Sequence, residues 1–323
     1  MGQNFTNELE QHNDLQKRKA YSESTLANIN LKAEAAFRDA PTPIAIFAAG
    51  SLGRLEIGRE SDLDLFIVSD KEDSTRVNRL EEIRVFSKLI EINRELKLPE
   101  FSGDGRYLKI HNLTELINST GDAHDDSENF FTTRLLLLLE SKSIHNNKLR
   151  EECIKKIVDN YFKDGNGKDF VPLFLLNDIL RYWRTLCLNY ERDRVRSENW
   201  WKKNLSLKFA RKLTVFSTIL LLLTDEVNSK ESLISAIDYV PLKRLAMSFD
   251  KINDETMLAG FKDFLNNYEK FLAAKSHAEL NNLEPSETIK NDFKIMVQSF
   301  GDMINIALMK TSDKSRLFKY LIA

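Results

Sequence analysis

Residues 44–69 constrain the fold of this chain more than any other stretch, because two short apolar runs flank a polar segment punctuated by glycine. The first run, IAIFAA, ends at Gly50-Ser51, and the second, LDLFIV, begins directly after Ser61-Asp62. Short apolar runs bounded by turn residues are typical of buried strands. The stretch therefore predicts a strand, a loop and a second strand.

Two aspartates at the second run, Asp62 and Asp64, alternate with leucines. Successive side chains of a strand point to opposite faces, so both carboxylates are expected on one face. Neighbouring carboxylates repel each other and lose hydration on burial, and a divalent cation relieves both costs. Mg²⁺ prefers oxygen ligands and commonly binds one or two carboxylates together with substrate phosphates. Because Gly50 and Ser51 offer bare backbone and a hydroxyl to a phosphate, the sequence predicts a Mg²⁺ and phosphate site.

A Gly-Ser pair, a spacer of ten residues and an Asp-x-Asp strand resemble the signature of the nucleotidyltransferase superfamily of DNA polymerase beta. The fuller string, GSLGRLE at 50–56 and SDLD at 61–64, is similar to the amino-terminal domain of the bacterial PII-modifying uridylyltransferases. The resemblance covers residues 44–145 and implies an α+β fold with a small mixed sheet and flanking helices. It implies an enzyme that moves a nucleoside monophosphate from a nucleoside triphosphate, such as ATP, to an acceptor and releases pyrophosphate. Mg²⁺ is the implied cofactor, with Mn²⁺ as the alternative.

The resemblance assigns roles to the residues of the motif, with Asp62 and Asp64 as catalytic metal ligands. Metal ions held at such a site activate the acceptor and stabilise the leaving group during in-line attack on the α-phosphorus. Three other residues offer backbone, a hydroxyl or a planar guanidinium fork and are expected to contact the phosphates: Gly50, Ser51 and Arg54.

Three further acidic residues near the motif have open or structural roles. Glu56 is expected to brace the loop by pairing with Arg54 or Arg59. A third catalytic carboxylate is expected on the next strand, and Asp104 and Glu100 are its two candidates. If neither completes the site, the chain binds nucleotide without turnover, as a regulatory or interaction protein.

The length of 323 residues and the apolar content of 42% suit two domains with cores of their own. Two glycines among charged residues at 163–169 mark the boundary. We expect a nucleotidyltransferase domain with N-terminal helices at 1–163 and an all-α helical bundle at 170–323. A long helix is expected over 74–97. Its inward face is expected to consist of Val77, Leu80, Ile83, Phe86, Ile90 and Ile92 or Leu96.

The helical half holds a second cluster of basic residues, with Arg181 and Arg184 on one predicted helix and Lys208 and Arg211 on the next. Residues three or four apart share a helix face. The cluster could bind the triphosphate or the acceptor, and the alternative is a pair of solvated basic faces.

The net charge limits the classes of acceptor that are expected, and the cysteine content indicates the cellular compartment. Charged residues make up 30% of the chain, yet the net charge is only −2, so no global attraction to nucleic acid is expected. The acceptor is then a protein, an RNA such as a tRNA end, or a small molecule, and the base of the nucleotide and the oligomeric state stay open. Two cysteines without metal-ligand spacing and a polar amino terminus without a signal-peptide core predict a cytoplasmic protein away from membranes.

Overall fold

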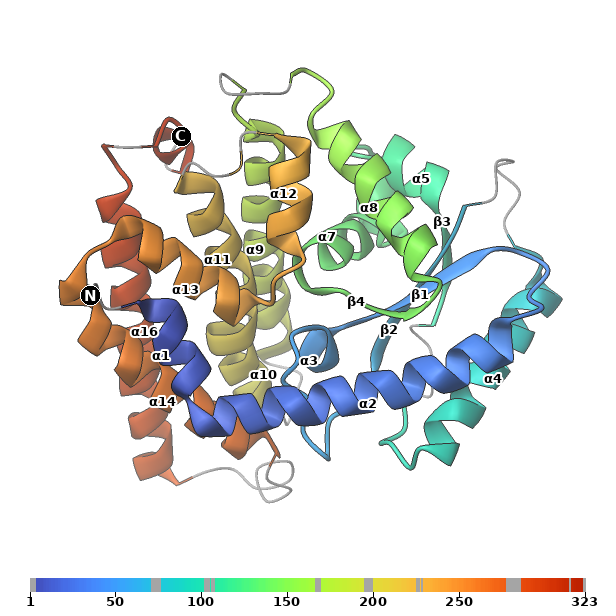
Figure 1. Ribbon diagram of the computed structural model, residues 1–323, viewed down its shortest axis with the longest axis horizontal. Helices are drawn as coiled ribbons and strands as arrows, with labels where there is room; N and C mark the ends of the chain where they lie inside the picture. Colours follow the sequence, from blue (N-terminus) through green and yellow to red (C-terminus); the bar gives the residue numbers. More distant parts are fainter. Residues whose placement is uncertain are drawn as a thin grey trace. The chain divides into compact units, whose positions relative to one another are not determined.

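The computed structural model describes residues 4–70, 77–101, 105, 108–165, 170–194, 200–224, 227, 229–276, 286–313 and 315–321. The chain divides into two compact units, described separately here (Figure 1). The sheet unit is Lys17–Lys163, and the helical unit combines Met1–Gln16 with Asp164–Ala323.

The sheet unit holds four described strands in the order β3-β2-β1-β4. Strand β1 (Ile44–Ala49) lies at the centre and pairs antiparallel with β2 (Asp64–Ser69) and with β4 (Lys142–His145). Strand β3 (Ile110–Asn112) pairs parallel with β2. The sheet is therefore small and mixed, with the two strands predicted from the sequence side by side.

Helices flank this sheet on both faces (Figure 1). One face packs against α2 (Asn13–Phe37) and α4 (Arg79–Glu95) in a core that includes Ile29, Ile46 and Leu89. Helices α7 (Phe130–Glu140) and α8 (Asn147–Tyr161) contact β1 from the other face. The remaining described helices of this unit are short: α3 (Gly50–Gly53), α5 (Leu113–Asn118) and α6 (Ala123–Ser127).

Among its described residues, the helical unit has no strand. It contains α1 (Phe5–Gln11), α9 (Leu173–Arg194), α10 (Trp200–Ser206), η2 (Leu207–Arg211), α11 (Lys212–Leu223), α12 (Lys230–Ile237), α13 (Pro241–Ile252), η3 (Glu255–Met257), α14 (Leu258–Ser276), α16 (Glu287–Lys310) and η4 (Phe318–Leu321).

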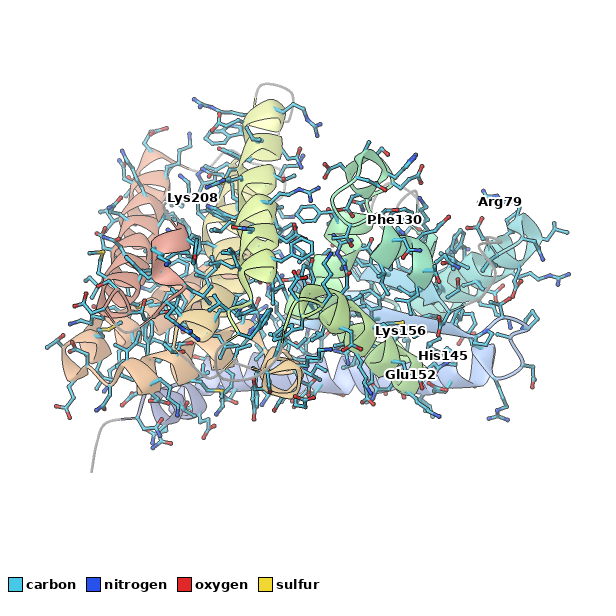
Figure 2. All side chains as sticks on the ribbon, turned by 90° about the horizontal axis from the view of Figure 1, so that it is seen from above. Arg79, Phe130, His145, Glu152, Lys156 and Lys208 are labelled. Atoms are coloured by element: carbon cyan, nitrogen blue, oxygen red, sulfur yellow. The ribbon has the colours of Figure 1, made fainter. Side chains whose placement is uncertain are left out.

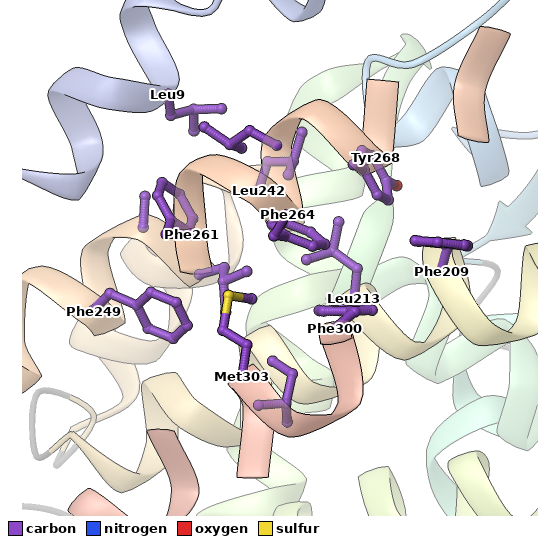
Figure 3. Close-up of a cluster of buried hydrophobic side chains, with 14 of the residues drawn as sticks. Leu9, Phe209, Leu213, Leu242, Phe249, Phe261, Phe264, Tyr268, Phe300 and Met303 are labelled. Atoms are coloured by element: carbon purple, nitrogen blue, oxygen red, sulfur yellow. The ribbon is translucent and has the colours of Figure 1, made fainter. Parts of the chain in front are cut away.

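Aromatic rings from several helices form the core of the helical unit (Figure 3). The ring of Phe209 stacks on Phe271 with centroids 4.9 Å apart, and Phe264 stacks on Phe300 at 4.5 Å. Helix α1 joins this core, because Phe5 contacts Phe249 and Phe261 edge-on.

The α+β class expected from the sequence is confirmed. The expected domain limit of 1–163 is wrong at its start, since residues 1–16 belong to the helical unit. Asp250 of α13 explains this placement, because its carboxylate accepts hydrogen bonds from the Phe5 and Thr6 backbone N–H groups at 2.7 and 3.2 Å. An acceptor that comes from a residue 244 or 245 positions away cannot be read from the local sequence of α1.

The inward face expected for the helix over 74–97 is right only in part. Its helix, α4, begins at Arg79 and buries Ile92 as expected, whereas Leu80 and Ile83 are exposed and Val85 and Leu89 are buried in their place. Strand β4 was not among the strands predicted from the sequence. No described helix is long and apolar enough to cross a membrane.

Candidate functional site

The turn between β1 and β2 brings backbone and carboxylate together. Ala49, the last residue of β1, pairs with Asp64, the first residue of β2, and Gly50 follows with a φ of +63°. A Cβ atom at position 50 would lie 2.0 Å from the Asp64 Oδ2 atom. Only glycine fits here, because both the positive φ and the carboxylate exclude a side chain.

One of the two aspartates lies on β2 and the other precedes it. Strand β2 begins at Asp64, which is exposed, and Asp62 is half-buried in the segment just before the strand. Leu63 and Leu65 are buried in the core beneath the sheet, at 5% and 7% exposure. The burial alternates as expected for a period of two, but the strand begins only at the second aspartate of the Asp-x-Asp motif.

Ser51 lies in the turn with its side chain close to the surface. The residue is 6% exposed, and its carbonyl oxygen accepts a hydrogen bond from the Glu56 N–H at 2.7 Å. Its hydroxyl makes no hydrogen bond to any residue that the structure describes. Ser51 can therefore offer this hydroxyl to a phosphate oxygen.

Arg54 has a different role from the one expected. Its side chain is 3% exposed, with Nε 2.9 Å from the Glu56 Oε2 atom and Nη1 2.8 Å from the Glu140 Oε2 atom. The predicted pairing of Glu56 with Arg54 is confirmed, but the expected phosphate contact of Arg54 is not met. A buried guanidinium held by two carboxylates braces the loop.

The backbone around this brace is strained and tightly packed. Leu55, between the paired Arg54 and Glu56, has a φ of +59°, a left-handed conformation that costs a bulky residue about 1 kcal/mol. Helix α2 holds the next residues, since Ser22 Oγ accepts the Ile57 N–H at 3.0 Å. The surroundings therefore impose a loop shape that its own residues do not favour.

Glu140, the last residue of α7, is a site residue that the motif does not contain. Its Oε1 atom accepts a hydrogen bond from the Gly50 N–H at 3.1 Å, and its side chain is fully buried. The Gly50 N–H, expected to face a phosphate, is thus engaged within the protein. The only sequence signal for Glu140 is a charged residue that ends the apolar run FFTTRLLLLL.

The third carboxylate stays undetermined. Asp104 lies outside the described residues. Glu100 is exposed and does not join Asp62 and Asp64, since no cluster of three possible metal ligands occurs in the part of the chain that the structure describes. Of the expected metal ligands, Asp62 and Asp64 are therefore the two that the structure describes near the start of β2.

The basic residues of the second cluster lie on packed neighbours of the helical unit, since α9 contacts η2 and α11. Arg184 and Lys208 are exposed, and Figure 2 labels Lys208. Arg181 is half-buried, with its Nη1 atom 3.6 Å from the Asp178 Oδ1 atom. Lys208 and Arg211 belong to η2, a π-helical turn. Such turns are rare and frequently found at functional sites.

Lys212 follows this π-helical turn and was not among the site residues predicted from the sequence. It is half-buried, with Nζ 5.4 Å from the centre of the Phe300 ring. Burial lowers the pKa of Lys212, and the positive charge of Lys208 lowers it further. The cluster is therefore a concentration of positive charge in a chain of near-neutral total charge.

Two comparisons bear on the family of the chain: no protein-family model matches it, and no curated protein matches it.

Proposed function

We propose that the sheet unit is a metal-dependent nucleotidyltransferase domain of the DNA polymerase beta-like superfamily. The observation that carries the proposal is the contact between the Gly50 turn and Asp64, where a single added carbon at Gly50 would meet the carboxylate. A nucleotidyltransferase needs a phosphate-binding turn and a metal-binding carboxylate within a few ångströms of each other. The mixed sheet and the alternating burial of residues 62–65 support the same conclusion.

The residues present fit a hard divalent cation, because two carboxylates lie at or just before the start of β2, beside a cradle that a Cβ atom would fill. Asp62 and Asp64 would hold Mg²⁺, or Mn²⁺, which when bound supplies positive charge against the triphosphate and the developing charge of the reaction. Ser51 would donate its hydroxyl hydrogen to a phosphate oxygen.

The proposed reaction is an in-line displacement at the α-phosphorus of a nucleoside triphosphate, such as ATP. A lone pair of the acceptor oxygen forms the new bond to the α-phosphorus, and the bond to the bridging oxygen breaks with its electrons leaving on pyrophosphate. The acceptor proton passes to a base, for which Asp104 is the remaining carboxylate candidate. The acceptor is proposed to be a protein, an RNA such as a tRNA end, or a small molecule.

The helical unit is proposed to bind the nucleotide or the acceptor through Arg181, Arg184, Lys208 and Arg211. Arg184 and Lys208 are exposed and form no ion pair with another residue that the structure describes, and their positive charge suits phosphate groups of either ligand. Replacing Arg184 and Lys208 together by Gln is expected to raise the KM for one of the two substrates.

The test is release of pyrophosphate by the purified protein with Mg²⁺ or Mn²⁺, each of the four nucleoside triphosphates, and protein, RNA and small-molecule acceptors. Asp62→Asn and Asp64→Asn should each lower turnover by about 100-fold or more, because each removes a ligand of the metal. Asp70→Asn is the matched control, since Asp70 follows the same strand and pairs with exposed Lys156 at 2.7 Å. Equal activity of the Asp64→Asn variant and the wild type would refute the proposal.

A second candidate function is nucleotide binding without turnover, in a regulatory or interaction protein. One observation favours it: no cluster of three possible metal ligands occurs among the described residues, where catalysis in this superfamily is expected to use three carboxylates. The variant Asp104→Asn separates the two functions. Loss of turnover with retained nucleotide binding supports the enzyme, whereas nucleotide binding by a wild type that never releases pyrophosphate supports the alternative.

A further inference from the structure

Glu140 lies where a carboxylate is costly. It is the last residue of α7, where the backbone carbonyl groups make the helix end negative. Its side chain is fully buried, so its charge has lost contact with water. A buried charge in this place needs strong partners, and these include the Gly50 N–H on Oε1 and the Arg54 guanidinium on Oε2.

The end of α7 that carries Glu140 is itself firmly held. Ser141, which caps this helix, donates its hydroxyl hydrogen to the Leu137 carbonyl at 2.6 Å. Arg150 of α8 donates to the Ser141 hydroxyl and to its carbonyl, both at 3.0 Å. The Glu140 carboxylate therefore extends from a fixed point of the core.

The same helix end fixes the short helix α3 at two places. A Cβ atom at Gly53 would lie 1.9 Å from the Glu140 carbonyl oxygen, so the backbones of α3 and α7 are in direct contact. At the other end of α3, the Glu140 side chain holds the Gly50 N–H. The Gly50 N–H thus donates a hydrogen bond to Glu140, and the Asp64 carboxylate packs against the Gly50 Cα.

We infer that Glu140 is the positioning residue of this site: through the Gly50 amide and Arg54 it sets the place of the Gly50-Ser51 turn relative to Asp64. Its effect on catalysis rests on the proposed function, whereas its effect on the turn does not. A residue that acts through such outer contacts typically changes metal affinity or activity by about 10- to 100-fold.

Glu140→Gln keeps the shape of the side chain and removes its charge. The matched control is Asp125→Asn, which also removes one charge from a buried pair: the Asp125 carboxylate accepts from Arg134 at 2.9 and 3.0 Å. Both variants should lower the melting temperature by similar amounts. Only Glu140→Gln should change the site.

The first readout follows the turn itself, without any activity. Two glycines follow an alanine in this sequence, Gly50 and Gly260. Labelling with ¹³C-carbonyl alanine and ¹⁵N-glycine therefore isolates two amide signals, and the one from Gly260 is an internal control. In Glu140→Gln the Gly50 signal should shift and its N–H should exchange with solvent about tenfold faster, because its charged acceptor is lost. In Asp125→Asn both signals should stay in place.

The second readout is catalytic. Glu140→Gln should lower kcat by about 10- to 100-fold while the KM for the nucleotide changes much less, and Asp125→Asn should keep the wild-type kcat. If Glu140→Gln does not fold, Arg54→Lys serves instead, since it breaks the fork that joins Glu56 to Glu140.

The outcomes separate this inference from the proposed function. An unchanged Gly50 signal in Glu140→Gln, or an equal change in Asp125→Asn, would overturn the inference. A shifted Gly50 signal in a protein that shows no nucleotidyl transfer at all would support the positioning role and refute the proposed function.

Discussion

Buried His111 should make the stability of this protein fall in mild acid. The residue lies on β3 and is 4% exposed. Its ring packs edge-on against the Phe130 ring, with the two ring centroids 5.9 Å apart. Its Nε2 atom is 3.2 Å from the Thr133 Oγ1 atom, and the Thr133 hydroxyl donates its own hydrogen to the Asn129 carbonyl. Nε2 must therefore carry the hydrogen of the neutral ring, and Nδ1 is buried without a hydrogen-bond partner among the described residues.

The pKa of His111 is lowered from 6.5 to about 4, mainly by burial and also by the charge of Lys109, while the charge of Glu128 opposes the change. Below pH 6.5 the unfolded chain binds a proton that the native protein excludes, so this contribution to stability is complete above pH 6.5. It decreases as the pH falls and is fully lost near pH 4. Each pKa unit corresponds to 1.36 kcal/mol, so the loss is about 2 kcal/mol at pH 5 and about 3 kcal/mol at pH 4.

The assay is urea denaturation of the wild type and of His111→Gln between pH 7.5 and pH 4.5. Glutamine can keep a donor near Thr133 but does not titrate. The variant should therefore lack the decrease in the free energy of unfolding that His111 causes at low pH, and should keep the decrease caused by all other groups. The difference in the free energy of unfolding between the wild type and His111→Gln should therefore change by about 2 kcal/mol between pH 7 and pH 5. Parallel pH profiles, or a native His111 that titrates near pH 6.5 by NMR, would refute the reasoning.

Three more substitutions test the packing. Gly53→Ala should destabilise the protein by roughly 2 kcal/mol or more, because its Cβ would overlap the Glu140 carbonyl at 1.9 Å, and urea denaturation measures the loss. Gly260→Ala is its counterpart in the first turn of α14, where a Cβ meets nothing within 4 Å, and should stabilise by roughly 0.4–1 kcal/mol; a loss there would contradict the geometry. Asp250→Ala should cost about 1 kcal/mol and speed amide exchange at Phe5, because the first two N–H groups of α1 lose their acceptor; unchanged exchange would speak against that contact.

Local pattern alone was sufficient for the central motif of this protein. The two strands, the glycine turn and the alternating burial of residues 62–65 all follow from apolar runs, a turn and a period of two within 26 residues. The pairing of Glu56 with Arg54 was also predictable, because the two residues are neighbours in one loop. Such signals reside in the stretch itself and need no knowledge of distant residues.

Only the tertiary structure shows that Glu140 contacts the Gly50 turn and that Arg54 is buried between two carboxylates, where it was expected to bind phosphate. Glu140 lies 90 residues beyond Gly50 in the sequence, and its contact exists because α7 packs on β1. The inward face of α4 and the placement of α1 in the helical unit were decided in the same way, by packing partners that no local period encodes. Contacts between distant residues depend on how the whole core is filled, so they appear only once the chain has folded.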